Sequence, residues 1–462
     1  MLLRFRVVLT IAFAYCLFES ASILLVAVGA AAETLGEVLE AARARNPAIA
    51  ATRTRAGARD VNVDQAKAGW LPTVSFTADA GLARDARTAG LALGDSNRPA
   101  GFAVTASQPI YDGGRTAAAV GAARATAGAE HERSRLVEQQ VLLAAVTAFA
   151  DVRLGRRLVR IAQDGVLLFE QTLQATRSKA RAQEATVADV AQAEAALAGA
   201  RAGQAAAQAG LAAGTAQFEA IVFRKPGPLA PPPARLGGLP ASADAAAAAA
   251  ARYSPGLVMA LHRQAAARYD IDRARSGYAP TLSLEARYRQ RFDLPGVVRE
   301  PDDLSVRAVV TVPLYSGGAT VADVTAARLG HVAAGYDVVD MRAQVKSAAL
   351  QAWSRHVSAN AARKSLQAQA AANRTALNGI RSEHRIGQRS VLDLITAQQA
   401  VLASDRALAE NERDRVTALY GLASLVKGIG PADGARTAAS SEDKTQSLAA
   451  LSAWSISVRK AE

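Results

Sequence analysis

Two very long segments of the chain carry apolar side chains at intervals of three and four residues. The first covers about 115–182 and the second about 319–386, and neither contains a proline. Such spacing places apolar side chains on one face of a helix, and a sustained pattern is typical of helices that pack along each other. At 1.5 Å per residue, about 68 residues would make a rod of roughly 100 Å. Shorter helical patterns lie at about 34–68, 187–222, 243–276 and 391–427.

Four shorter segments alternate apolar and polar side chains with a period of two. They cover about 71–80, 101–110, 280–290 and 304–314. In the first segment, Val74 and Phe76 would face one side of a strand, while Ser75 and Thr77 would face the other. Each segment has about ten residues, which is the length of a tilted membrane strand with an apolar outside and a polar inside. Four half-buried strands of a soluble sheet would show the same alternation.

Four aromatic residues at the ends of these segments favour the membrane interpretation. Trp70 and Tyr278 precede the first and third strands, whereas Tyr111 and Tyr315 follow the second and fourth. If the strands are antiparallel, all four side chains lie at one level, where aromatic residues form a girdle at the membrane interface. After residue 32, no run of about 20 apolar residues remains, so we expect no membrane-spanning helix.

The phrases QPIYDGGRT, at 108–116, and VPLYSGGAT, at 312–320, indicate an internal repeat. Their glycine pairs lie 204 residues apart, and several other matching segments follow in the same order. A connector rich in Pro and Gly, at 224–242, separates a first repeat at 33–223 from a second repeat at 243–427. Each glycine pair would let the chain bend from a strand into a long helix. The expected bend residues are Gly113, Gly114, Gly317 and Gly318.

The two ends of the chain lack this repeated pattern. Residues 1–32 resemble a secretory signal peptide, because a basic start and an apolar stretch lead to the small residues Ala30-Ala31-Ala32. The only cysteine, Cys16, lies within this segment, so the mature chain would contain no thiol. Residues 428–462 show no periodicity, and we expect them to form a flexible tail.

Composition and charge argue against several classes of function. The formal net charge is +13, but Arg residues are scattered among Asp and Glu without a block of five or six, so we expect no nucleic-acid partner. The hydrophobic half of the chain is rich in Ala, and only 5% of residues are aromatic, which suits long, closely packed helices. We find no metal-ligand spacing of histidines, no phosphate-binding loop and no nucleophile elbow. We therefore expect no enzymatic activity, no metal and no cofactor.

Four strands are too few to close a barrel. In lipid, an open sheet would leave the backbone N–H and C=O groups of its two edges without partners. Several copies of the chain would therefore have to contribute strands to one barrel. Two copies would give eight strands and a filled cylinder, whereas three would give twelve strands and room for a water-filled bore.

Taken together, the "LP/AP-T" strand starts, the paired Y-(D/S)-G-G phrases and GQRSVLDLITAQQA resemble the TolC-like outer membrane efflux family. The resemblance covers about 34–428. It implies a mainly α fold in which long antiparallel coiled helices form an α-helical barrel, with four strands per chain in a shared twelve-stranded transmembrane β-barrel. The connector and part of the tail would form an equatorial region. The resemblance also implies a homotrimer in outer-membrane lipid of a Gram-negative bacterium, extending into the periplasm.

The same resemblance implies a function. Proteins of this kind are exit ducts for an inner-membrane transporter and work through a periplasmic adaptor, or membrane fusion protein, in type I protein secretion or drug efflux. Lipid-anchored relatives carry an N-terminal cysteine, and its absence here favours the secretion branch. The alternative is a soluble periplasmic coiled-coil adaptor or scaffold, which would also be helical and rich in Ala but would not need four alternating strands.

The resemblance places the turns at about 183–186 and 387–390 at the periplasmic tip, where a gate narrows the tunnel. The matching gate positions are Asp189, Asp393, Arg389 and His384, whereas family members often carry an aromatic residue at the position of His384 and a second acid at that of Thr396. Three chains would bring six carboxylates into one ring. Such a ring would favour cations, and its charges would repel one another unless Arg389 or neighbouring groups offset them.

Both acids also fit a structural role. Thr186-x-x-Asp189 and Ser390-x-x-Asp393 match the capping pattern of a helix N-terminus, with the acid near the positive end of the helix dipole. Capping and gating are compatible, and the sequence leaves both open.

Overall fold

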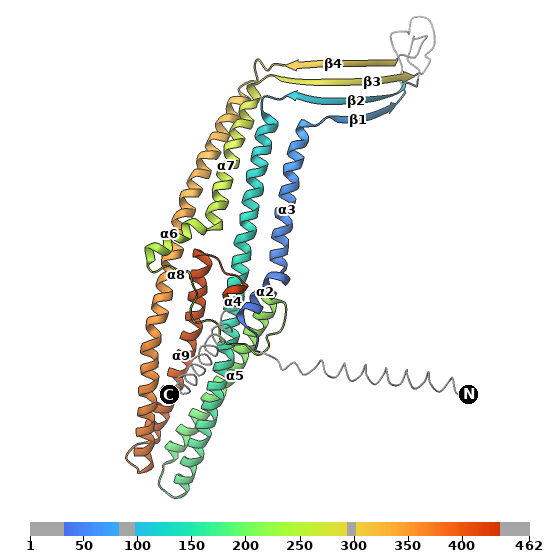
Figure 1. The fold of residues 1–462 in the computed structure, drawn as a ribbon. Helices are drawn as coiled ribbons and strands as arrows, with labels where there is room; N and C mark the ends of the chain where they lie inside the picture. Colours follow the sequence, from blue (N-terminus) through green and yellow to red (C-terminus); the bar gives the residue numbers. More distant parts are fainter. Residues whose placement is uncertain (1–31, 83–97, 293–301, 435–462) are drawn as a thin grey trace, which may run out of the picture. The chain divides into compact units, whose positions relative to one another are not determined.

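The computed structural model describes residues 32–82, 98–292 and 302–434 (Figure 1). The expected signal peptide lies outside these residues except for its last position, and so does the expected tail from residue 435 onward. The described residues form two compact units. The first unit takes its described residues from 32–47, 138–250 and 348–434, and the second from 48–82, 98–137, 251–292 and 302–347.

The two halves of the chain contain the same elements in the same order. The first half has α2 (Leu35–Arg45), α3 (Pro47–Lys67), the 3-10 turn η1 (Ala68–Trp70), β1 (Thr73–Ala80), β2 (Ala100–Tyr111), α4 (Arg115–Arg181) and α5 (Val187–Val222). The second half has α6 (Ala243–Tyr253), α7 (Pro255–Arg275), η3 (Ser276–Tyr278), β3 (Thr281–Phe292), β4 (Asp302–Thr311), α8 (Ala319–Arg385) and α9 (Val391–Val426). The long helices α4 and α8 have 67 residues each, and α5 and α9 have 36 each, as a duplication requires. No helix in the described segments combines the length and the apolar character needed to cross a bilayer.

The expected helices at 34–68 and 243–276 were wrong as single helices, because each is broken by a proline. Asn46 ends α2 with φ −71° and ψ 119°, and Pro47 begins α3. A residue that precedes proline is driven out of the α region, so the first helix cannot continue. Ser254 and Pro255 make the same break, and the Ser254 hydroxyl accepts a hydrogen bond from the N–H of Leu257 at 3.3 Å.

The main core of the first unit lies where α2, α4, α5 and α9 meet. The apolar spacing predicted for α4 is confirmed here, because the spaced side chains of that helix are almost fully buried. Aromatic truncations in such a core cost about 3–5 kcal/mol of stability. The core side chains include Leu35, Leu39, Leu142, Ala145, Phe149, Val152, Phe218 and Tyr420.

The connector and the first residues after α9 pack on this core. Leu236 of the connector belongs to the core, and Leu229 forms a parallel bridge with Glu33. Residues 428–434, which we expected to belong to a flexible tail, lie against the core instead. Ile429 is buried, and its N–H donates a hydrogen bond to the side chain of Gln139 at 2.7 Å. Residues 428–434 therefore lie against α4 and α9, because the side chain of Ile429 is part of the core that these helices form.

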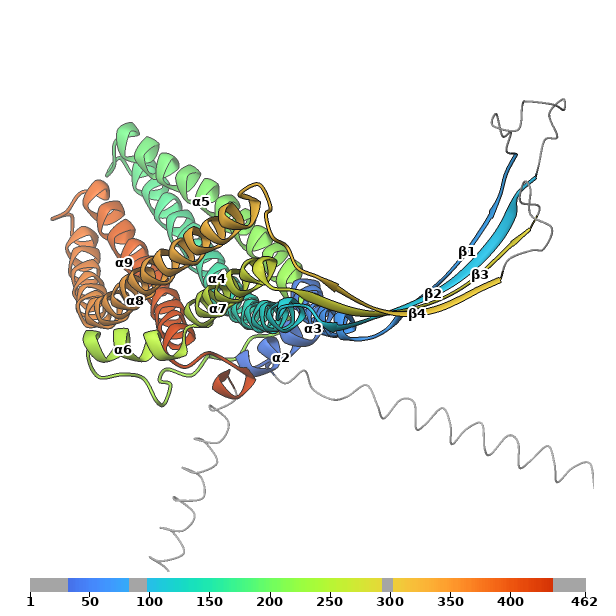
Figure 2. The ribbon, with the colours of Figure 1, turned by 90° about the horizontal axis from the view of Figure 1, so that it is seen from above.

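The second unit contains one antiparallel sheet in the order β1-β2-β3-β4. Its register confirms the predicted period of two, because Phe76 pairs with Val104, Val104 with Tyr288, and Tyr288 with Leu304. One face of the sheet is therefore almost entirely apolar. The opposite face carries polar and charged residues, including the paired Thr105 and Arg287. Figure 2 shows the four strands curving together.

The apolar face of the sheet is uncovered. Val74, Phe76, Leu304 and Val306 are 66–75% exposed. Four aromatic rings also cluster on this face, toward the ends of the strands far from the glycine pairs. The ring of Phe102 lies 6.1 Å from those of Phe76 and Tyr288 and 6.4 Å from that of Phe292. An exposed apolar surface of this extent needs a partner other than water.

The sheet has two open edges. In the described part of the chain, β1 pairs only with β2, and β4 pairs only with β3. Each outer strand therefore offers a row of backbone N–H and C=O groups to another strand.

Candidate functional site

The four predicted girdle residues lie at the same end of the sheet. Trp70 and Tyr278 close the 3-10 turns before β1 and β3, Tyr111 ends β2, and Tyr315 follows β4. The antiparallel register brings these strand ends together. All four side chains are between 46% and 89% exposed. They are available to contact lipid headgroups, and this contact stays a prediction.

The predicted bend residues have the backbone that the bend requires. Gly113 and Gly114 have φ values of 70° and 84°, and Gly317 and Gly318 have 63° and 86°. These values lie in the left-handed region that favours glycine. Gly113 also lies close to another segment, because a Cβ atom there would overlap the Cβ of Ala279. At Gly317, an added Cβ would meet no atom within 4 Å.

Alanine substitutions should separate these two requirements. Gly113→Ala and Gly317→Ala both force a side chain into the left-handed region, which costs about 1–2 kcal/mol. Only Gly113→Ala adds the overlap with Ala279, so it should lower the melting temperature further. Thermal unfolding followed by circular dichroism measures the difference. Equal melting temperatures of the two variants would contradict a role for the close approach.

At both tips, the predicted acid closes a capping box. The N–H and the hydroxyl of Thr186 donate to Asp189 Oδ2 at 2.9 and 2.8 Å, and the Asp189 N–H donates to Thr186 Oγ1 at 3.1 Å. Ser390 and Asp393 repeat the three contacts at 3.2, 2.9 and 3.1 Å. The capping interpretation of both acids is therefore confirmed.

The capping contacts also change the charge properties of the two acids. Hydrogen bonds from the backbone and side chain of Thr186 lower the pKa of Asp189, because they stabilise the ionised form. The contacts from Ser390 lower the pKa of Asp393 in the same way, and the positive charge of Arg389 adds to the effect. Both tips therefore carry a carboxylate at neutral pH.

Arg389 pairs with an acid that the sequence patterns did not predict. Its Nε atom donates to Glu383 Oε2 at 2.8 Å, across the turn of the second repeat. This contact raises the pKa of Arg389. Arg389 therefore forms its ion pair with Glu383 and acts on Asp393 only through its electrostatic field.

His384 connects the two tips through Lys179. His384 Nδ1 lies 2.9 Å from the carbonyl oxygen of Arg389, and it must donate because a carbonyl only accepts. In a neutral His384, Nε2 is then the acceptor, and Lys179 Nζ lies 3.4 Å from it. Lys179 also donates to the His384 carbonyl at 3.3 Å. Since Lys179 belongs to α4 and His384 to α8, these contacts hold the two repeats together at the tip.

A comparison of the two tips could have identified these missed residues. Lys179 and Glu383 occupy equivalent positions 204 residues apart, with opposite charges. A difference of this kind between repeats indicates a contact that the repeat itself does not require. The partner of each charge depends on tertiary packing and was therefore not visible in either tip alone.

Removal of the two tip carboxylates tests their role in ion passage. Asp189→Asn with Asp393→Asn removes both charges and keeps an acceptor oxygen at each cap. If the acids line a gate, single-channel recordings in planar bilayers should show altered conductance and a weaker preference for cations over anions, because fixed negative charge attracts cations.

Glu37→Gln is the matched control for this double variant. Glu37 closes a capping box with Thr34 at the start of α2, outside the tips, with contacts of 3.2 and 3.3 Å. This control should leave conductance and selectivity unchanged. If the double variant also left them unchanged and lowered only the thermal stability, the two acids would have a capping role alone.

Comparison with known proteins gives matches along both repeats. The family model described as outer membrane efflux protein matches residues 38–221 and 247–427. Outer membrane efflux protein BepC of Brucella suis biovar 1 is 30% identical over 400 residues, which cover 85% of each chain. Alkaline protease secretion protein AprF of Pseudomonas aeruginosa is 26% identical over 190 residues, which cover 39% of this chain and 38% of AprF.

Solved structures show the same fold. The outer membrane protein VceC of Vibrio cholerae aligns with a TM-score of 0.73 at 16% sequence identity, covering 85% of this chain and 96% of VceC. The likeness to VceC concerns the arrangement of helices and strands.

Proposed function

The chain belongs to the outer membrane efflux protein family and lies in the outer membrane, and we propose that three copies form one export duct. Twelve strands would form its transmembrane barrel, and the long helices would form a tunnel in the periplasm of a Gram-negative bacterium. The duct would receive its cargo from an inner-membrane transporter through a periplasmic adaptor. Membership in a family of channels also means that the chain is not an enzyme. It contradicts the alternative of a soluble adaptor or scaffold.

The open, two-faced sheet is the observation that carries this proposal. Its apolar face is exposed, and the edges along β1 and β4 lack partner strands in the described residues. In hydrocarbon, each unpaired backbone group would cost several kcal/mol. Pairing of β1 in one copy with β4 in the next would remove both edges. The apolar face would then meet lipid, and the polar face would line the bore.

An export duct needs a water-filled bore, which favours a barrel of three copies over a barrel of two. An eight-stranded barrel is filled by its own side chains, whereas a larger barrel leaves an aqueous channel. The polar face carries long side chains from β3 and β4, among them Arg287, Arg289 and Arg307. These side chains need space and water, which a twelve-stranded barrel would provide.

A stripe on α8 supports assembly of several copies independently of the sheet. Its apolar side chains recur at intervals of three and four and are 52–72% exposed. The equivalent residues of α4 are small or charged, so the repeated helix does not require apolar residues there. A neighbouring copy would cover the stripe. The stripe consists of Leu329, Val332, Tyr336 and Val339, and its counterparts in α4 are Ala125, Gly128, Glu132 and Arg135.

Both kinds of cargo are compatible with such a duct. BepC is named for efflux and AprF for the secretion of a protease. A tunnel lined by generic polar groups can pass either class, and the choice of cargo then belongs to the transporter. We propose that this chain serves type I protein secretion or small-molecule efflux in this way.

The assembly can be tested by placing a charge in the stripe. Size-exclusion chromatography with light scattering in detergent should find three chains per particle for the unaltered protein. Tyr336→Glu should shift the particle toward single chains, because the packed interface would bury an unpaired carboxylate. Tyr336→Phe keeps the ring and should remain trimeric. A stable single chain of the unaltered protein, or a Tyr336→Glu particle of unchanged mass, would contradict the role of the stripe in assembly.

A further inference from the structure

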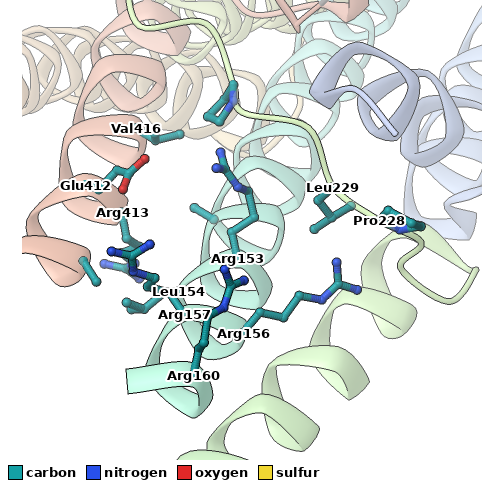
Figure 3. Close-up of a pocket in the computed structure, with 13 residues that line it drawn as sticks. Arg153, Leu154, Arg156, Arg157, Arg160, Pro228, Leu229, Glu412, Arg413 and Val416 are labelled. Atoms are coloured by element: carbon teal, nitrogen blue, oxygen red, sulfur yellow. The ribbon is translucent and has the colours of Figure 1, made fainter. Parts of the chain in front are cut away.

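A pocket rich in arginine lies in the first unit, between α4, α9 and the connector (Figure 3). Its volume is about 430 Å³, within the range of pockets that hold small ligands. Four of its arginines come from one face of α4 and a fifth comes from α9. These residues are Arg153, Arg156, Arg157, Arg160 and Arg413.

Two of the five arginines have structural partners. Arg156 donates from Nη1 to the carbonyl of Gly227 at 2.8 Å and from Nη2 to that of Pro226 at 3.1 Å. It thereby holds the connector against α4. Arg413 donates from Nε to Asp151 at 2.7 Å and from Nη1 to Asp414 at 3.0 Å. The charge of Arg413 is therefore balanced within the chain.

The other three arginines make no hydrogen bond or ion pair with any residue in the described ranges. Arg153 is half-buried, and burial lowers its pKa because the charged group loses hydration, an effect that Glu412 opposes. Arg157 and Arg160 are exposed. In Figure 3, the side chains of Arg153 and Arg160 extend into the space between α9 and the connector. The pocket thus contains three arginines without a hydrogen bond or ion pair in the described chain, and Glu412 acts on Arg153 only through its electrostatic field.

The duplication shows that the helix does not need these arginines. The helix α8 has the same length as α4, yet only one of its four equivalent side chains is basic. The concentration of positive charge on this helix face is therefore specific to the first repeat. The four arginines form no contiguous basic block in the sequence, but their intervals of three and four place the side chains on one helix face. The equivalent residues of α8 are Val357, Asn360, Ala361 and Lys364.

The remaining walls of the pocket indicate the kind of ligand. Leu154, Leu229 and Val416 give it an apolar side, and Glu412 is the only acid that lines it. The planar guanidinium group matches carboxylate and phosphate with two parallel hydrogen bonds. We propose that this pocket binds a small organic anion that carries two or more phosphate or carboxylate groups. The apolar side would receive the body of the ligand.

This site is separate from the proposed export function. Its ligand would contact α4, α9 and the connector together, and its affinity can be measured whether or not the chain forms a duct. A ligand that binds only the folded chain would also raise the melting temperature.

Isothermal titration calorimetry on the purified full chain in detergent tests the proposal with tripolyphosphate and citrate as probes. At least one probe should bind saturably, with one site per chain. The double variant Arg157→Gln with Arg160→Gln should weaken that binding by about tenfold or more, because two charge-assisted contacts are lost. Both residues are exposed, so the variant should fold, which circular dichroism verifies. The probe that binds with the higher affinity, tripolyphosphate or citrate, assigns the ligand to the phosphate or the carboxylate class.

The matched control is Arg363→Gln with Lys364→Gln. It removes two positive charges from exposed positions of α8 in the same unit, and it should leave the affinity unchanged. Absence of saturable binding of both probes would overturn the proposal. Equal weakening by the two double variants would also overturn it, because the probes would then respond only to the net charge of +13.

Discussion

Backbone hydrogen bonding at the edges of the sheet is the constraint on which this account depends. Water can satisfy the free N–H and C=O groups of an outer strand, but hydrocarbon cannot. A sheet with two open edges and an exposed apolar face is therefore incomplete in a membrane. Placing the partner strand on another copy of the chain would satisfy both edges at once and would give the proposed assembly closed symmetry.

The internal duplication explains the regular parts of the chain, and the differences between the repeats indicate its specific contacts. The equal lengths of α4 and α8, the glycine pairs and the two capping boxes occur in both halves. By contrast, the position of Lys179 in the first repeat is occupied by Glu383 in the second, with the opposite charge. The four arginines of α4 likewise have no full counterpart in α8. The tip link and the anion pocket are built from these unrepeated residues. A duplicated chain can thus keep one scaffold while its halves take different tasks.

Much of this organisation could be predicted from the sequence because it depends on local chemistry. The period of two predicted which side chains share a face of the sheet. Thr186 and Ser390, each followed three residues later by an acid, predicted the starts of α5 and α9. The helix breaks before Pro47 and Pro255 also depend on local chemistry. They were not predicted, because apolar residues continue on both sides of each proline. Contacts between distant segments could not be predicted in this way. The pair of Lys179 and His384, separated by 205 residues, depends on how the helices pack, and so does the burial of Ile429 beside Gln139.

Disulfide trapping between the outer strands of neighbouring copies tests the shared β-barrel most directly. The only native cysteine, Cys16, lies in the expected signal peptide, so introduced thiols would have no competitor in the mature chain. Cysteines would be paired between β1, at Ser75 or Thr77, and β4, at Ser305 or Arg307. In oxidised outer membranes, at least one pair should give a ladder of linked chains that reaches three. Only single chains from every pair, in folded protein, would contradict pairing between copies.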